Sequence, residues 1–152
     1  MKVLFVLLLF INFIFAEDKF QRDGNIVYDK ELKLFWQDDI QTSYTKLELK
    51  DSIKYCKNLK LNGYKNWRLP SYVELMSIGN YEEYKPILNE TFKHSASGHF
   101  WSIIYKRVGY GKSWRKVNDY YVKRIYFSDG YSYDNDRTGK AYVRCVREDL
   151  NS

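Results

Sequence analysis

The chain has 152 residues, 45% of them hydrophobic and 18% aromatic, and carries 25 lysines and arginines against 19 aspartates and glutamates, a formal net charge of +6. A chain of this length buries about two-thirds of the surface that its unfolded form exposes, which indicates one domain with its own core. Four Trp, fifteen Tyr and nine Phe, with only two Pro and eight Gly, exclude disordered, collagen-like and low-complexity classes.

Residues 1–16 have the pattern of a secretory signal peptide. Lys2 precedes an apolar run that ends at Phe15, and Ala16 is a small residue at a suitable cleavage point. This run is shorter than the roughly 20 apolar residues of a membrane span. We therefore expect export to the periplasm or cell exterior and a single mature domain over residues 17–152 without a transmembrane span. An uncleaved anchor in the membrane interface is the alternative.

Cys56 and Cys145 are the only cysteines. In an oxidising compartment, an even pair in a small domain predicts one disulfide, and two buried free thiols are the alternative. Closing a loop of about 90 residues would stabilise the fold by about 4–5 kcal/mol if the stabilisation comes from chain entropy.

The first half of the mature chain predicts a hairpin and a helix. Short β-branched and aromatic runs at residues 25–29 and 34–37 flank a charged turn at 30–33. Helical spacing then puts four residues on one apolar face, and Asn62-Gly63 is the predicted end of that helix. The four residues are Leu49, Ile53, Cys56 and Leu59.

A second, short helix is predicted after Pro70. Ser71 and Glu74 have the spacing of a capping box, and the helix should continue to about Ile78 and end at Gly79. The polar, irregular stretch 80–98 is expected to be a loop.

The second half predicts strands. Residues 99–105 and 121–127 are strand candidates, Asp129-Gly130 is a hairpin-turn signal that leads to Tyr131 and Tyr133, and the last strand is expected over 141–147. Its alternation places Ala141, Val143 and Cys145 on one face, so a disulfide would join the first helix to the last strand. The expected fold class is α+β, with two short helices packed on short antiparallel strands.

Several segments resemble a known family of bacterial proteins. They are Leu34-Phe35-Trp36-Gln37-Asp38, Tyr55-Cys56, Gly63-Tyr64-Lys65-Asn66-Trp67-Arg68-Leu69-Pro70-Ser71 with Glu74-Leu75, Phe100-Trp101-Ser102, Phe127-Ser128-Asp129-Gly130 and Val143-Arg144-Cys145-Val146-Arg147. In this order they resemble the DUF1566 family, also called the Lcl C-terminal domain after a collagen-like adhesin of Legionella. The resemblance covers nearly all of residues 24–147.

The resemblance implies a C-type-lectin-like fold with a helix-to-last-strand disulfide between Cys56 and Cys145. It also implies an exported bacterial protein, which in some members binds sulfated glycosaminoglycans on host surfaces. This chain departs from the family because it lacks a collagen-like stalk, has Ile103 where Ser or Thr is usual, and has a more basic segment before Val122.

Residues 105–124 hold a local net charge of +6, whereas the mature chain as a whole carries +5. Arginine forks and lysine point charges bind sulfates or phosphates, and aromatic faces stack on sugar rings. We predict a polyanion site in this segment, and a solvated loop anchored by its aromatic residues is the alternative. The predicted ligand-binding residues are Lys106, Arg107, Lys112, Trp114, Arg115, Lys116, Lys123 and Arg124.

Other candidate sites are weaker. The oxygen-rich cluster of Asp129, Asp134 and Asp136 suits a hairpin turn better than a calcium site, although the sequence leaves calcium open. His94 and His99 lack the further ligands that zinc requires. We therefore expect no metal and no cofactor.

The chain has no Gly-x-Ser-x-Gly nucleophile motif, and its cysteines occupy a structural position, so we expect no enzyme and no catalytic residues. The predicted function is an exported, lectin-like binding domain or adhesin for sulfated or acidic glycans, with an anionic polysaccharide or host surface glycan as partner and no nucleic acid. The alternative is a protein-interaction or structural module of the bacterial envelope that binds no glycan.

Overall fold

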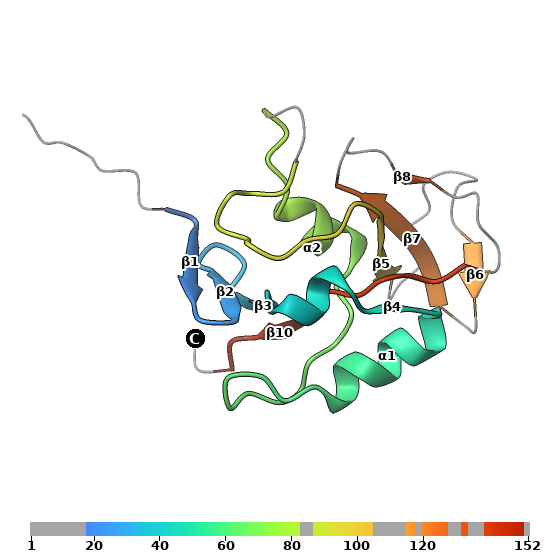
Figure 1. The fold of residues 1–152 in the computed structure, drawn as a ribbon, viewed down its shortest axis with the longest axis horizontal. Helices are drawn as coiled ribbons and strands as arrows, with labels where there is room; N and C mark the ends of the chain where they lie inside the picture. Colours follow the sequence, from blue (N-terminus) through green and yellow to red (C-terminus); the bar gives the residue numbers. More distant parts are fainter. Residues whose placement is uncertain are drawn as a thin grey trace, which may run out of the picture.

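A computed structural model of the chain describes residues 18–82, 87–104, 115–117, 120–127, 132–133 and 139–150. It has two helices and two sheets, which confirms the predicted mixed α+β class (Figure 1). The predicted signal peptide and the predicted turn at Asp129 and Gly130 lie outside the described residues.

The first sheet has the strand order β1-β2-β3-β10 and is antiparallel throughout. Its strands are β1 (Phe20–Asp23), β2 (Ile26–Asp29), β3 (Leu34–Gln37) and β10 (Val146–Glu148). The predicted hairpin is β2 and β3, and its turn is fixed by Asp29, whose carboxylate accepts hydrogen bonds from the amides of Glu31 and Leu32. Strand β1 was not predicted.

The second sheet has the order β4-β9-β5-β7-β6, and β8 pairs with β7. Its strands are β4 (Lys46–Leu47), β9 (Ala141–Tyr142), β5 (His99–Ile104), β7 (Tyr120–Tyr126), β6 (Arg115–Val117) and β8 (Ser132–Tyr133). The longest pairing joins β5 to β7, antiparallel from His99 opposite Tyr126 to Ile104 opposite Tyr121. The predicted strands 99–105 and 121–127 are therefore confirmed within one residue at each end.

The single strand predicted over residues 141–147 is wrong, because the chain changes sheets within it. Strand β9 belongs to the second sheet and β10 to the first. Between them the Val143 amide donates to the Thr45 carbonyl, and the Gln37 amide donates to the Cys145 carbonyl. This crossing segment, residues 143–145, joins the two sheets, and all three of its residues are fully buried.

Helix α1 (Leu49–Asn58) has the predicted apolar face but ends four residues before Asn62. Asn62 and Gly63 both have positive φ, at 47° and 78°, and the flanking Leu61 and Tyr64 form a β-bridge. Two positive φ values in succession are typical of a type I′ turn, so Asn-Gly closes a tight hairpin here instead of capping the helix. A short 3₁₀ helix, η1 (Ile40–Ser43), lies between β3 and β4.

Helix α2 (Tyr72–Ser77) begins with the predicted capping box. The Glu74 amide donates to the Ser71 hydroxyl at 3.2 Å, and the Ser71 amide donates to the Glu74 carboxylate at 2.7 Å. These two bonds satisfy amides at the helix start that have no partner within the helix.

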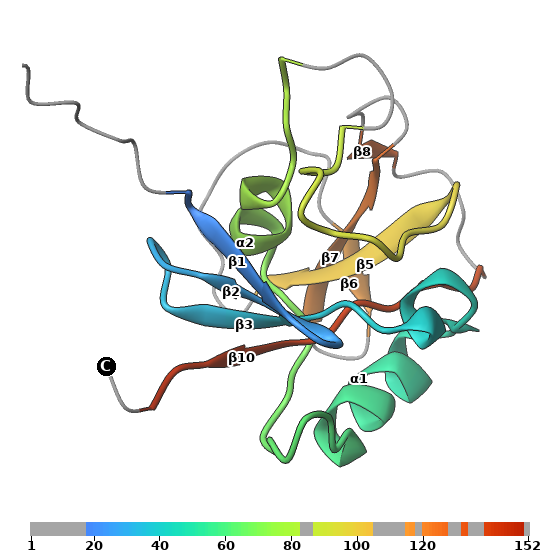
Figure 2. The same cartoon turned by 60° about the vertical axis from the view of Figure 1, so that its left-hand side comes forward.

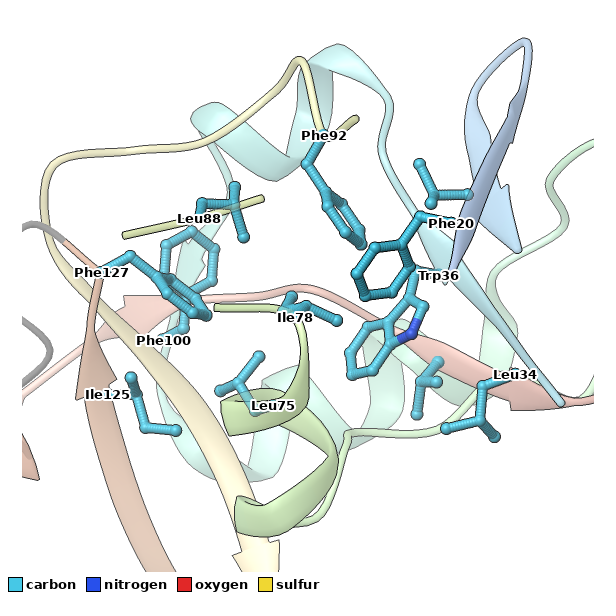
Figure 3. Close-up of a cluster of buried hydrophobic side chains, with 12 residues drawn as sticks. Phe20, Leu34, Trp36, Leu75, Ile78, Leu88, Phe92, Phe100, Ile125 and Phe127 are labelled. Atoms are coloured by element: carbon cyan, nitrogen blue, oxygen red, sulfur yellow. The ribbon is translucent and has the colours of Figure 1, made fainter. Parts of the chain in front are cut away.

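Two hydrophobic clusters cover opposite faces of the β5–β7 pair. Phe100 and Ile125 belong to the cluster that includes α2, β1 and β3 (Figure 3). Trp101 and Ile103 belong to the cluster that includes α1 and the crossing segment. The two views in Figures 1 and 2 accordingly show α2 and α1 on different sides of this sheet.

The predicted disulfide is present. Cys56 of α1 and Cys145 of the crossing segment are bonded, with Cα atoms 5.5 Å apart and a sequence separation of 89. A disulfide is consistent with an oxidising compartment outside the cytoplasm. In the described part of the chain, no helix is long and apolar enough to cross a membrane.

Candidate functional site

The predicted polyanion site lies only partly within the described residues. Lys106, Arg107, Lys112 and Trp114 fall outside them. The backbone of Arg115 and Lys116 forms part of β6, in register with Val122 and Tyr121 of β7. Strand β7 lies between β5 and β6, so the chain from Ile104 to Arg115 joins two strands that flank β7.

Lys123 and Arg124, the last two predicted ligand residues, occupy opposite faces of β7. Arg124 is in register with Trp101, lies over its ring at 5.3 Å and is only 7% exposed. Lys123 is half-buried on the other face, with its ammonium 4.8 Å from the ring centre of Tyr72 in α2. The sheet therefore does not bring these two cations together into one site.

A buried ion network, which was not predicted, ties the loop before β5 to the first sheet. Asp38 and Arg144 are both fully buried, and the Arg144 guanidinium donates to the Asp38 carboxylate at 2.9 Å. Arg22 bonds the other carboxylate oxygen, and the amides of Lys93 and His94 donate to Asp38 at 2.8 and 3.2 Å. One carboxylate thus holds two arginines and two backbone amides.

Arg144 makes further contacts that fix its orientation. Its guanidinium donates to the Gln37 carbonyl at 2.9 Å and to the His94 carbonyl, and it lies 5.0 Å from the ring centre of Phe92 and 5.8 Å from that of Phe100. Burial alone would raise the pKa of Asp38, but the Arg144 charge and the hydrogen bonds to the carboxylate outweigh burial and lower it. This network stabilises the ionised carboxylate and is structural.

The Trp-Arg-Leu-Pro segment is also tied to the last strand. Arg68 exchanges backbone hydrogen bonds with Val146, both at 2.8 Å. Its guanidinium donates to both oxygens of Glu74 at 2.8 Å and to Glu148 at 3.1 Å. Burial acts to raise the pKa of Glu74, but these bonds and the Ser71 amide lower it overall. Arg68 therefore connects the start of α2 to β10.

Arg147 closes a row of aromatic side chains on the outer face of the first sheet. Register places Tyr28, Phe35 and Arg147 side by side on β2, β3 and β10. The Arg147 guanidinium lies 4.5 Å from the ring centre of Tyr64 and 5.3 Å from that of Phe35. The rings of Phe35 and Tyr64 are themselves stacked, with centres 5.0 Å apart.

An open cavity of about 290 Å³ lies beside Arg147. It is lined by residues from the loop before α2 and from the end of β10, namely Asn66, Arg68, Arg147, Glu148 and Leu150. The lining combines two guanidiniums, one carboxylate, one carboxamide and one apolar side chain. The sequence signal for it was Arg147, the final Arg of Val-Arg-Cys-Val-Arg, which directly follows four residues that the structure buries.

The histidines and aspartates weighed as metal ligands are placed as follows. The His94 backbone takes part in the Asp38–Arg144 network, and the His99 ring lies 5.1 Å from that of Tyr126. Asp129, Asp134 and Asp136 lie outside the described residues. Within the part of the chain that the structure describes, no three His, Cys, Asp or Glu side chains gather where they could hold a metal ion.

Comparison with known proteins gives a family but no individual relative. No curated protein and no solved structure matches the chain. The family model of the Lcl C-terminal domain matches residues 25–147, a range that contains both sheets except β1 and the final residue of β10, both helices and the disulfide. The chain therefore belongs to the Lcl C-terminal domain family.

Proposed function

We propose that this protein is an exported bacterial binding domain that captures sulfated or acidic glycans through the basic, aromatic segment 105–124. The observation that carries the proposal is the distribution of charge. This segment holds a net charge of +6, while the rest of the mature chain carries about −1. Membership of the Lcl C-terminal domain family supports a binding role of this kind.

The chemistry of the segment suits a polymer with repeated anionic groups. Seven lysines and arginines in twenty residues attract such a chain over a distance of about 10 Å at moderate salt, and aromatic side chains then contact its sugar rings. Lys123 beside Tyr72 supplies one cation on an aromatic surface at the β7 end of the segment. Binding of this type weakens steeply as salt competes for the charged groups.

The test is retention on a heparin column of residues 17–152 and of a variant with Arg107, Lys112, Arg115 and Lys116 changed to Ala. A matched control changes Lys50, Lys54, Lys57 and Lys60 to Ala, which removes the same charge from exposed positions in and just after α1. We expect the segment variant to elute at clearly lower salt than the wild type, and the control to elute close to the wild type. Equal elution of the segment variant and the wild type would overturn the proposal, as would an equal loss in the control.

We also propose that the domain acts without catalysis. Both cysteines are in the disulfide, so neither supplies a thiol for an oxidation reaction. An envelope protein as partner is the competing function. A partner captured from periplasm and retained in high salt would favour it, because polyanion capture is lost under that condition.

A further inference from the structure

The Arg147 guanidinium is buried beside a cavity without a counter-charge of its own. The residue is 8% exposed, and within the described residues its Nε meets no hydrogen-bond acceptor. Because the Nε itself is sealed from solvent, an acceptor from outside the domain would have to be held by the terminal N–H groups of Arg147, which lines the cavity.

The stacking on Phe35 and Tyr64 leaves Arg147 suited to such an acceptor. A guanidinium that stacks on a ring uses its face, while its N–H groups lie in its plane and remain available at the edge. The two rings hold that plane in one orientation, at 5.3 and 4.5 Å from the ring centres. A planar carboxylate binds a fixed guanidinium edge through two parallel hydrogen bonds.

The neighbouring Arg68, unlike Arg147, is paired with carboxylates. Arg68 is already neutralised by the two-fold contact with Glu74 and by Glu148. It lines the same cavity, so it adds donors without adding an uncompensated charge. Arg68, Arg147, Glu74 and Glu148 together carry no net charge, so the cavity suits one group held by the Arg147 donors better than a polyanion.

The rest of the lining suits a sugar better than a bare anion. Glu148 is 63% exposed at its side chain and accepts hydroxyl hydrogen bonds, Asn66 both donates and accepts, and Leu150 is a 68% exposed apolar side chain. Small-molecule sites combine such an apolar wall with a few polar groups, and about 290 Å³ is at the lower end of their volumes.

From these observations we propose that the cavity between Arg147 and Arg68 binds one carboxylated sugar residue, with the sugar carboxylate on the Arg147 edge and sugar hydroxyls on Asn66 and Glu148. The cavity lies beside β10 of the first sheet, whereas Arg115 and Lys116 belong to β6 of the second sheet (Figure 1). The inference extends the proposed glycan binding to a second surface and does not depend on the basic segment.

The experiment follows the Arg147 Nε–H resonance of isotopically labelled residues 17–152 by NMR, identified by its loss in Arg147→Lys. Glucuronic acid should shift this resonance saturably, whereas glucose should leave it unchanged and acetate should bind at least about tenfold more weakly. Arg147→Lys keeps the positive charge but loses the planar pair of guanidinium donors. The glucuronate concentration that half-saturates the shift of the Asn66 side-chain amide should therefore rise at least about tenfold.

Three results would overturn this proposal. They are an Arg147 resonance unaffected by glucuronate, an equal response to glucose, and equally tight binding of acetate or of a dipeptide with a free C-terminal carboxylate. The Arg107, Lys112, Arg115 and Lys116 to Ala variant separates the two proposals, because it should lose heparin retention and keep the glucuronate response. Loss of both responses in that folded variant would contradict a separate site.

Discussion

Arg144 and Arg147 lie three residues apart, and both stack on two aromatic rings, yet their surroundings differ. Arg144 is fully buried and donates to a carboxylate and to two carbonyls. Arg147 is almost as buried, and its Nε, like that of Arg144, meets no acceptor among the described residues, but Arg147 lines a cavity. Burial and ring stacking are therefore common to both arginines, and what differs is the ion pair of Arg144 and the cavity beside Arg147.

The largest expected effect is a difference in the free energy of unfolding between a variant that disturbs Arg144 and one that replaces Arg147. Asp38→Ala leaves Arg144 buried without its counter-charge, and breaking a buried pair in this way costs about 3–5 kcal/mol. Arg147→Met keeps the packing volume and leaves no charge unpaired, so its free energy of unfolding should change by about 1 kcal/mol or less. Urea denaturation of both variants with the disulfide intact measures the two values. Equal losses would remove the distinction between the arginines.

The second expected effect is a dependence on pH that involves Arg144 but not Arg147. The pKa of Asp38 is lower in the folded protein than its ordinary value of 3.8. Its contribution to stability is therefore complete above that value and is lost as the pH falls through the lower folded pKa. Urea midpoints measured from pH 6 to pH 2 should fall more steeply for the wild type than for Asp38→Asn.

Arg147→Met serves as the control for the pH experiment and should keep the acid dependence of the wild type. Some dependence should remain in Asp38→Asn, since the pKa of Glu74 is also lowered. Identical profiles for the wild type and Asp38→Asn would contradict the assignment of the acid sensitivity to the buried pair.

The smallest expected effect concerns the support of Arg68, which lies beside Arg147. Ser71→Ala removes one arm of the capping box and should lower the free energy of unfolding by about 1 kcal/mol. It leaves both oxygens of Glu74 on Arg68. Thermal unfolding checks the stability change. Ser71→Thr, which keeps the hydroxyl, should restore most of it, and a loss as large as that of Asp38→Ala would contradict a purely local role.

Much of the fold could be predicted from the sequence because its signals are local. The Ser71–Glu74 capping box, the spacing of the α1 face and the alternation in β7 each depend on residues within a few positions of one another. The misses have long-range causes. Strand β1 buries a single apolar side chain, Phe20, and forms because it pairs with β2.

The loop predicted over 80–98 lacks helices and extended strands in its described part, but it supplies Leu88 and Phe92 to the core, which polar composition did not indicate.

The candidate site was harder to predict than the fold. Asp38 and Arg144 are 106 residues apart in sequence, so no local pattern joins them. The charge count located the basic segment, and the period of two in the predicted strand 121–127 already implies that Lys123 and Arg124 face opposite ways. The structure adds their partners, Tyr72 for Lys123 and Trp101 for Arg124.

The crossing segment, residues 143–145, also has a consequence for how the domain is made. Strand β3 pairs with β10, and helix α1 is bonded to Cys145, so both depend on residues made much later than themselves. Because synthesis runs from the N-terminus, neither contact can form before residues 145–148 have been made. Until then Cys56 lacks its native partner and is open to coupling with another thiol. Rapid arrival of Cys145 therefore favours correctly oxidised protein.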